Sequence, residues 1–357
     1  MSFPKRREQL QERARQAGCQ WFAAASPAAI GYLTGVFPTA PSLLLLSEKS
    51  RLLLAPEGTA FPEGEVCGYA YYSGEFPSRP MEDCLNLLKG RSFSGKAAVE
   101  RFACPGWVEE LFDGVVPADA MLREEMTRKD AAGLKGIRKC LALNAAVFRD
   151  LSRSIRSGVT ELDVYHRILT VLAEETGEPA EIRCDILSGE RTAWIAGGPT
   201  QRVLQEGEPL IVDLLVRHDG YWSDTTRTFF AGDPTPEQLE VHVAVCRALR
   251  AGEEALRHCS TAGEVDRAVK ESLAADGYAG RMEHHSGHGL GYEPYGAPYF
   301  VRTSSEVLEP GMVVTLEPGA YFPGRFGIRL ENAYLLEESG VRPLFDFPEE
   351  PEAFILK

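Results

Sequence analysis

One stretch, IVDLLVRHDGYWSDTTRTFF at residues 211–230, constrains the fold of this chain more than any other. Two apolar runs rich in β-branched and aromatic residues flank Asp219-Gly220, a dipeptide that favours a tight turn between antiparallel strands. If the hairpin turns about His218-Asp219, Asp213 and Asp224 face each other directly. If it turns about Asp219-Gly220, they are diagonal neighbours on one face, and only an odd-length loop or a bulge would separate them.

Two carboxylates on one face of a sheet repel each other and destabilise it unless something neutralises them. A shared proton, an arginine such as Arg227, or a bound cation would each do so. The hairpin alone also fits a surface pair of strands with two solvated aspartates. The choice between these interpretations therefore depends on the rest of the chain.

Charge and hydropathy exclude several classes of protein. The 357-residue chain has a formal net charge of −14, whereas a nucleic-acid or acidic-membrane partner would require a basic face. The N-terminal stretch MSFPKRREQL lacks the apolar core of a signal peptide, and no apolar run is long enough to span a bilayer. None of the eight cysteines forms a CxxC pair. We therefore expect a cytoplasmic protein with free thiols and with no nucleic-acid or membrane partner.

The pattern of the chain changes near residue 123, and its length is sufficient for two domains. Short apolar strands alternate with helices in 1–122, which predicts a small α/β domain, with 30–35 as a turn-rich connector. In 123–357, apolar residues spaced at three, four and seven predict a long amphipathic helix that ends before Gly158.

Capping signals at Thr160, Thr235 and Thr261 predict three further helices in the second domain. Three histidines fall on these predicted helices, and we expect them at the surface or at the edge of the core. They are His166, His242 and His258.

Two glutamates stand out in the last third of the chain. Glu317 and Glu331 fall within apolar strands predicted over 312–317 and 328–336, where a carboxylate is costly to bury unless it is paired or coordinated. With the hairpin aspartates and a histidine of the Gly-rich loop HHSGHGLG, they would supply mostly oxygen ligands. Such a set suits Mn²⁺ first, with Co²⁺, Fe²⁺ or Zn²⁺ as alternatives. Four carboxylates exceed what one divalent ion needs, so they indicate a pair of ions.

The strings VDLLVRHDGYWSDTTRT, HHSGHGLG, TLEPGAY and GIRLENA, in this order, resemble those of the pita-bread metallopeptidases. The resemblance is to the branch that contains prolidase (Xaa-Pro dipeptidase) and aminopeptidase P. It implies an α+β fold, in which a small α/β N-terminal domain precedes a C-terminal pita-bread, creatinase/aminopeptidase-like catalytic domain. It also implies a homodimer.

The resemblance further implies that five residues hold two divalent metal ions. Asp224 and Glu331 would bridge both ions, Asp213 would complete one shell, and His288 and Glu317 would complete the other. A hydroxide that bridges the ions would attack the scissile carbonyl. Glu317 would also carry a proton towards the leaving imino nitrogen.

Other positions concern the substrate. His284 matches a family histidine that hydrogen-bonds the substrate or the oxyanion. Its neighbour His285 is left open, because only one of the pair need point inward. Arg329 is a candidate anchor for a substrate carboxylate or, equally, a structural partner of the ligands.

Two positions depart from the pattern of the family. Ala196 stands where the family usually has a histidine after its Ser-Gly pair, and Tyr295-Gly296 stands where it has His-Glu. These positions usually bind substrate, so we expect an intact metal site with altered substrate contacts. The phenol of Tyr295 would still donate one hydrogen bond.

The expected activity is metal-dependent hydrolysis of the Xaa-Pro imide bond in dipeptides, on a small peptide substrate with proline at the second position. A short chain with one small N-terminal domain favours prolidase over its relatives. The alternatives are an aminopeptidase P that acts on longer Xaa-Pro peptides, and a diverged member of the same fold with another substrate or no catalysis.

Overall fold

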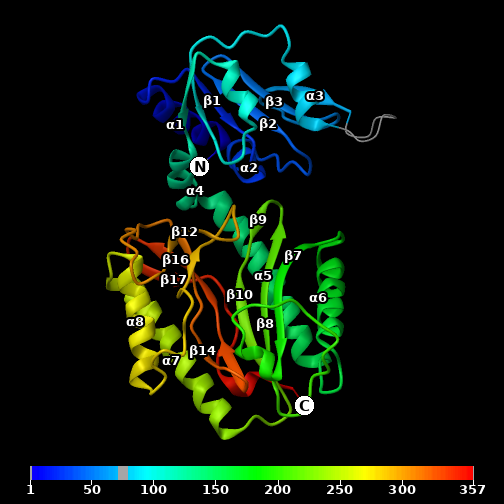
Figure 1. Ribbon diagram of the computed structural model, residues 1–357, viewed down its shortest axis with the longest axis vertical. Helices are drawn as coiled ribbons and strands as arrows, with labels where there is room; N and C mark the ends of the chain where they lie inside the picture. The colour runs from blue at the N-terminus through cyan, green and yellow to red at the C-terminus, as the bar shows by residue number, and fades with distance from the viewer. Residues whose placement is uncertain (1, 71–78, 357) are drawn as a thin grey trace. The chain divides into compact units, whose positions relative to one another are not determined.

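The computed structural model describes residues 2–70 and 79–356, which form two compact units, Met1–Met126 and Thr127–Lys357 (Figure 1). The domain boundary predicted after residue 122 lies within helix α4 (Asp119–Thr127). Residues 71–78 lie outside the described residues, as do residues 1 and 357. None of the described helices is both long and apolar enough to cross a membrane.

The first unit contains a six-stranded mixed sheet in the order β4-β3-β2-β1-β5-β6. Alternating strands and helices build it, as the sequence predicted. Its strands are β1 (Trp21–Ala24), β2 (Leu43–Ser47), β3 (Arg51–Pro56), β4 (Glu65–Tyr69), β5 (Lys96–Val99) and β6 (Gly114–Pro117). Its helices, besides α4, are α1 (Phe3–Gln16), α2 (Pro27–Thr34), α3 (Pro80–Leu87) and the 3-10 helix η1 (Gly106–Leu111).

The turn-rich connector expected at 30–35 is wrong, because most of this stretch belongs to helix α2. The hydroxyl of Ser26 accepts a hydrogen bond from the backbone N–H of Ala29 at 3.1 Å, and Pro27 opens the helix. Gly35 ends it in the left-handed conformation, at φ 74°. The glycines suggested a turn, but the cap and the burial of the side chains stabilise a helix.

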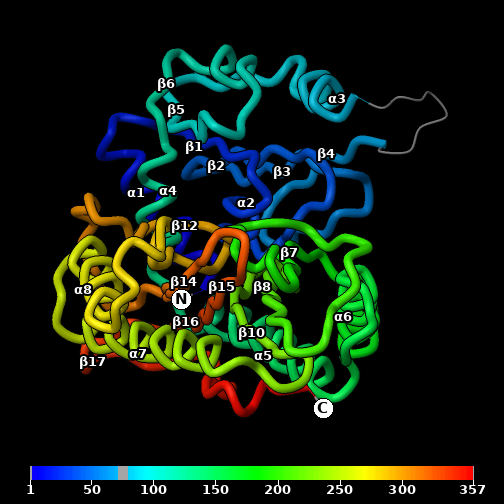
Figure 2. Tube along the Cα trace, turned by 60° about the horizontal axis from the view of Figure 1, so that its bottom comes forward, coloured from blue at the N-terminus to red at the C-terminus, as the bar shows by residue number. Residues whose placement is uncertain are grey.

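The second unit contains two larger sheets with helices on their outer sides. Figures 1 and 2 both show α7 and α8 on one side of this unit and α6 on the other, with strands between them. Helices α5 and α6 contact the sheet of order β18-β10-β8-β7, in which β9 also pairs with β8. Helix α7 contacts the sheet of order β12-β11-β13-β16-β17 and the two-stranded sheet β14-β15.

The elements of the second unit have the following bounds. The helices are α5 (Ala131–Ser154), α6 (Glu161–Thr176), α7 (Pro236–His258), α8 (Ala262–Ala275), and the 3-10 helices η2 (Gly189–Ala193) and η3 (Pro351–Phe354). The strands are β7 (Glu181–Ser188), β8 (Pro209–His218), β9 (Tyr221–Trp222), β10 (Thr225–Ala231), β11 (His288–Gly289), β12 (Gly296–Tyr299), β13 (Val313–Leu316), β14 (Gly319–Phe322), β15 (Phe326–Arg329), β16 (Asn332–Glu337), β17 (Gly340–Pro343) and β18 (Ile355–Leu356).

The predicted helix starts in this unit are confirmed. Thr160 and Thr235 each form a reciprocal capping box with the residue three positions later. At the third start, the carboxylate of Glu264 accepts a hydrogen bond from the backbone N–H of Thr261 at 3.0 Å. These caps satisfy backbone donors that the first turn of a helix leaves free.

Glu317 and Glu331 lie between sheets and not inside strands, which corrects the two predicted strands. Strand β13 ends at residue 316, and the stretch 328–336 is divided between β15 and β16, which belong to different sheets. The two glutamates thus mark two crossing points, where the chain passes from one sheet to another. The N–H of Leu330 donates to the carbonyl of Pro318 at 3.1 Å, so these crossing points are joined directly.

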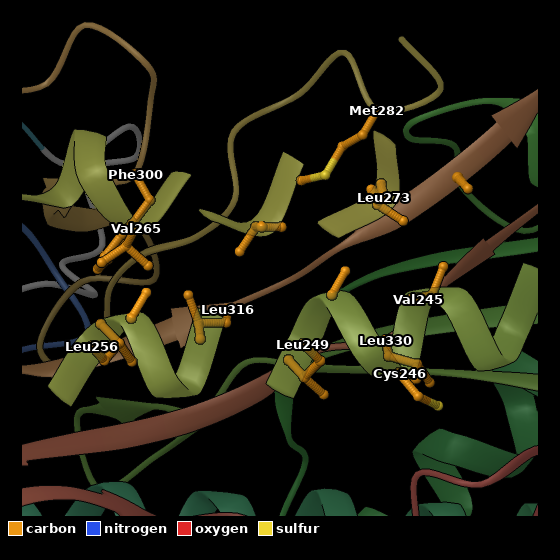
Figure 3. Packing of buried hydrophobic residues seen from close by; sticks show 14 of the residues in the cluster. Val245, Cys246, Leu249, Leu256, Val265, Leu273, Met282, Phe300, Leu316 and Leu330 are labelled. Carbon is orange, nitrogen blue, oxygen red and sulfur yellow. The ribbon is translucent and has the colours of Figure 1, made fainter. Parts of the chain in front are cut away.

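The apolar core beside these crossing points fixes the position of both glutamates. Leu316 and Leu330 are fully buried, and each immediately precedes one of the glutamates. They pack with α7 and α8 in the cluster of Figure 3, which includes Leu249 and Val265. Burying each leucine contributes about 1.5–3 kcal/mol relative to exposure. The packing therefore holds the backbone from which each carboxylate projects.

His242 is fully buried on α7, so the expectation of a surface or core-edge position is wrong for this residue. Its ring packs near Phe230 and Phe354, with centroid distances of 5.9 and 6.3 Å. Phe354 comes from η3 near the C-terminus, and this tertiary contact was not visible in the helical pattern.

Candidate metal centre and substrate pocket

The central hairpin turns about Asp219-Gly220, the second of the two registers that the sequence left open. Asp213 pairs with Thr226 between β8 and β10, and His218 pairs with Tyr221 between β8 and β9. Both turn residues have positive φ, 49° and 80°, as a two-residue I′ turn requires. Asp224 is therefore a diagonal neighbour of Asp213 on the same face.

Asn144 of α5, which is fully buried, holds the hairpin on both sides of Asp224. Its Nδ2 donates to the carbonyl of Leu214 and to Oγ1 of Thr225, both at 2.7 Å. Its Oδ1 accepts from Oγ of Ser223 at 2.9 Å. The sequence reasoning missed this residue, and the available signal was one amide at a core position of the helical pattern.

All eight residues predicted for the site line one pocket of about 180 Å³. The hairpin, the Gly-rich loop and the two crossing points each contribute side chains to it. The eight are Asp213, Asp224, His284, His288, Tyr295, Glu317, Arg329 and Glu331, and the pocket is completed by Asp185, Ile195, Ala196 and His285.

Each of the four carboxylates has one buried oxygen with no hydrogen-bond partner among the described residues. These atoms are Asp213 Oδ1, Asp224 Oδ1, Glu317 Oε1 and Glu331 Oε1. A buried polar atom without a partner costs about 1–3 kcal/mol, and more when the group is charged. Four such oxygens in one pocket are satisfied together by cations. The residues therefore fit divalent metal ions.

The mutual repulsion of the carboxylates is visible in their acidities. Burial and the charges of neighbouring carboxylates raise the pKa of Asp224 and of Glu331 well above their ordinary values. Burial raises the pKa of Asp213 to about 6, although Arg329 opposes the shift. Burial also opposes ionisation of Glu317, but the adjacent His285 and the other two histidines hold its pKa at about 2. Without a compensating positive charge, the four groups do not all ionise at neutral pH.

His288 directs a ring nitrogen without a hydrogen, Nε2, towards these carboxylates. Its Nδ1 lies 3.0 Å from the carbonyl oxygen of Gly289, which only accepts, so in the neutral ring Nδ1 carries the hydrogen. Nε2 lies 3.4 Å from Oδ2 of Asp224 and 3.8 Å from Oε1 of Glu317. A ring oriented by a backbone carbonyl in this way is typical of a metal-ligating histidine.

The potential ligand atoms fall into two groups, each within 4.8 Å. One group contains Asp224, His288 and Glu331, and the other contains His284, His285 and Glu317. Asp213 belongs to neither group, and its Oδ2 is bonded to an arginine.

Both ring nitrogens of His284 are engaged. Nδ1 donates to the carbonyl of His285 at 2.7 Å, so the hydroxyl of Tyr321 donates to Nε2 at 2.8 Å. Burial lowers the pKa of His284 to about 4, which keeps the ring neutral. His284 therefore contacts a substrate only after Tyr321 releases Nε2. The sequence reasoning missed Tyr321, which lies on β14, two residues beyond the EPG string.

Arg329 is buried and tied to the protein. Its Nη2 donates to Oδ2 of Asp213 at 2.8 Å and lies 3.5 Å from Oδ2 of Asp185. Its Nη1 donates to the carbonyl of Ile195 at 2.6 Å and to the hydroxyl of Tyr321 at 3.2 Å. Of the two roles that the sequence left open, these contacts favour a structural partner of the ligands.

Asp185 is a further carboxylate in the pocket that the sequence reasoning missed. It pairs with Asp213 across the β7–β8 ladder, and its Oδ1 accepts from the N–H of Gly197 at 2.9 Å. The available signal was an acid within the strand sequence EIRCDILS.

A buried carboxylate at the start of α6 anchors the loop that carries wall residues 195–196. Oε1 of Glu161 accepts from N and Oγ of Ser188, both at 2.8 Å. Oε2 accepts from N and Oγ1 of Thr200, at 2.9 and 2.7 Å, and also pairs with Arg191. Both ends of the loop are therefore fixed to one side chain.

Tyr295 lies at the mouth of the pocket, 46% exposed. Its ring meets that of His288 edge-on, with centroids 5.0 Å apart and an interplanar angle of 72°. Ala196 is also exposed. Ala196 and Tyr295, which depart from the family pattern, thus both lie in the wall of the pocket. Neither provides one of the unpartnered carboxylate oxygens.

The match to a known family covers all the residues that line this pocket. The model of metallopeptidase family M24 matches residues 135–338. The chain is 35% identical over 241 residues to the probable dipeptidase PepE of Mycobacterium tuberculosis, which covers 66% of this chain and 64% of that protein. A recombinant prolidase from Thermococcus sibiricus has TM-score 0.85 at 24% identity, covering 98% of both chains. The X-Pro aminopeptidase from Thermotoga maritima has TM-score 0.83 at 23% identity, covering 96% and 98%. These matches confirm the predicted pita-bread fold.

Proposed function

The chain belongs to metallopeptidase family M24, and on that premise we propose that it hydrolyses the Xaa-Pro imide bond of dipeptides with the help of two divalent metal ions. One observation carries the proposal. Four unpartnered carboxylate oxygens and the bare nitrogen of His288 converge in one pocket.

The proposed ligands are the five residues with these atoms. Mn²⁺ suits a set dominated by carboxylates, with Co²⁺, Fe²⁺ or Zn²⁺ as alternatives. Bound ions would neutralise the carboxylates, polarise the scissile carbonyl and make water nucleophilic at neutral pH. The ligands are Asp213, Asp224, His288, Glu317 and Glu331.

The other residues of the pocket would bind, orient and move protons. Glu317 has an unpartnered oxygen inside the pocket, so it would receive a proton from the attacking water and pass it to the leaving nitrogen. His284 would hydrogen-bond the substrate once Tyr321 releases its Nε2. Tyr295 would offer its phenol from the mouth of the pocket. Arg329 would keep Asp213 oriented.

The size of the pocket favours a dipeptide over a longer peptide. Its volume of about 180 Å³ is below the about 300–1,000 Å³ of sites for drug-sized ligands. The X-Pro aminopeptidase among the similar structures makes an aminopeptidase P the second candidate. Ala196 and Tyr295 support a third, in which the same centre acts on a substrate of another class. We also propose a homodimer, which the family resemblance implies, and a cytoplasmic location, which the composition favours.

Hydrolysis of three peptides tests the proposal. An Xaa-Pro dipeptide, the matched Xaa-Pro tripeptide and an Xaa-Ala dipeptide would be assayed after chelation and again after adding Mn²⁺. We expect cleavage of the Xaa-Pro dipeptide alone, only with metal present. Preference for the tripeptide would establish an aminopeptidase P. Cleavage of neither proline peptide, with about two ions bound per chain, would refute a peptidase of this specificity.

A further inference from the structure

We propose that His285 is an additional nitrogen ligand of the metal ion held by His288 and Glu317. The inference rests on the proposed metal centre and does not depend on its substrate. The side chain of His285 is 40% exposed, but its Nδ1 is buried and has no hydrogen-bond partner among the described residues. An imidazole nitrogen buried without a partner beside unpartnered carboxylate oxygens calls for a cation.

The distances fit a shared ion. Nδ1 of His285 lies 3.0 Å from Oε1 of Glu317, which also lacks a hydrogen-bond partner among the described residues. Two ligand atoms, each about 2.1 Å from one ion and at a right angle, are separated by about 3.0 Å. The same oxygen lies 3.8 Å from Nε2 of His288, so two imidazole nitrogens lie within 4 Å of it.

A simple hydrogen bond between His285 and Glu317 explains the contact less well. The separation of 3.0 Å lies within hydrogen-bond range, and a hydrogen bond from His285 would lower the pKa of Glu317, yet neither Nδ1 nor Oε1 has an aligned hydrogen-bond partner among the described residues. In a chelate, the lone pairs of nitrogen and oxygen point at the ion and not at each other. A nitrogen and an oxygen at this separation that lack an aligned hydrogen bond therefore fit coordination of one ion.

His284 does not compete for this role, although it belongs to the same group of potential ligands. Its Nδ1 is bonded to a backbone carbonyl and its Nε2 to the hydroxyl of Tyr321. Of the adjacent pair, His285 thus supplies a buried ring nitrogen that has no hydrogen-bond partner among the described residues. The sequence left the role of His285 open, since only one of the two need point inward, and the structure shows that both line the pocket.

A second imidazole changes which metal this position prefers. Imidazole suits Zn²⁺, Fe²⁺ and the later first-row ions, whereas carboxylate and water suit Mn²⁺. The ion at His285, His288 and Glu317 would bind two nitrogens. We therefore expect the two positions to differ, with Co²⁺ or Zn²⁺ favoured at this one and Mn²⁺ accepted at the other.

The test compares the wild type with His285→Gln, using Co²⁺ and Mn²⁺ separately as probes. His258→Gln is the matched control, because that histidine is 71% exposed on α7. Titration calorimetry should show that one Co²⁺ ion binds at least about tenfold more weakly in His285→Gln, since even outer contacts of a ligand are worth about 10–100-fold. Mn²⁺ affinity should fall less. The visible absorption of bound Co²⁺ should change only in His285→Gln.

Equal Co²⁺ affinity and an unchanged spectrum in His285→Gln would overturn the inference and leave the proposed peptidase intact. No Co²⁺ or Mn²⁺ binding by the wild type would overturn both. Changed Co²⁺ binding in a protein that cleaves no Xaa-Pro peptide would support the ligand and refute the substrate. If the variant does not fold, ¹⁵N-labelled histidine in the wild type gives the answer. Zn²⁺ should shift Nδ1 of His285, and an unshifted signal would overturn the inference.

Discussion

The buried imidazole of His242 predicts a defined loss of stability in acid. The residue is fully buried on α7, and its Nε2 has no hydrogen-bond partner among the described residues. Burial, reinforced by the charge of Arg227, lowers its pKa from 6.5 to about 3. Glu350 opposes this shift, and the thiol of Cys246 lies 3.5 Å from Nδ1.

The sign and the size follow from proton linkage. Between pH 6.5 and about 3, the unfolded chain binds a proton at this histidine and the folded protein does not. The contribution of His242 to the free energy of unfolding is therefore fully present above pH 6.5 and is lost as the pH falls. A pH of 5.0 is about 1.5 units below the pKa of this imidazole in the unfolded chain. At about 1.4 kcal/mol per unit, the free energy of unfolding falls by about 2 kcal/mol.

Urea unfolding of the unit that contains α7, at pH 7.5 and 5.0 with the same metal concentration, measures this loss. His242→Gln removes the titrating group, and His258→Gln on the same helix is the control. The wild type and the control should lose about 2 kcal/mol more than His242→Gln between the two pH values. Carboxylates titrate in all three proteins, so their contribution cancels. Equal losses, or an NMR titration of His242 near its ordinary pKa, would refute the reasoning.

Three further outcomes are expected. Asp224→Ala should abolish metal binding and Xaa-Pro hydrolysis together, and full activity with bound metal would remove Asp224 from the ligand set. Asn144→Ala breaks three buried hydrogen bonds to the hairpin and should lower the free energy of unfolding by about 3 kcal/mol, at about 1 kcal/mol for each bond. A measured loss near zero would contradict that role. Tyr295→Phe should reduce kcat while the metal content stays constant, and unchanged kcat and KM would show that its phenol does not contact the substrate.

The carboxylates of the site were accessible from the sequence because their signals are local. The Asp219-Gly220 turn restricts the register of the hairpin, and the register determines which face Asp213 and Asp224 share. Glu317 and Glu331 were found as acids among apolar residues. Their surroundings were predicted wrongly, since an apolar run does not reveal where a chain passes from one sheet to another.

The residues that support the site could not be identified in the same way. Asn144 bonds to atoms 70 to 81 positions later, and Arg329 bonds to Asp213 across 116 positions. Such partners become visible only when the sheets are assembled. The burial of His242 depends equally on η3, which packs against α7 from the far end of the chain.

The anchoring at Glu161 of the loop between Ser188 and Thr200 affects how the substrate pocket can evolve. Ser188 and Thr200, which bond to that carboxylate, lie outside the tip of the loop, and the contact of Ile195 with Arg329 uses a backbone carbonyl. Side chains at 195 and 196 can therefore be exchanged without altering the path of the chain. The backbone of the loop stays fixed while the side chains at 195 and 196 can vary. Selection, or a mutant library, can explore new substrates there one residue at a time.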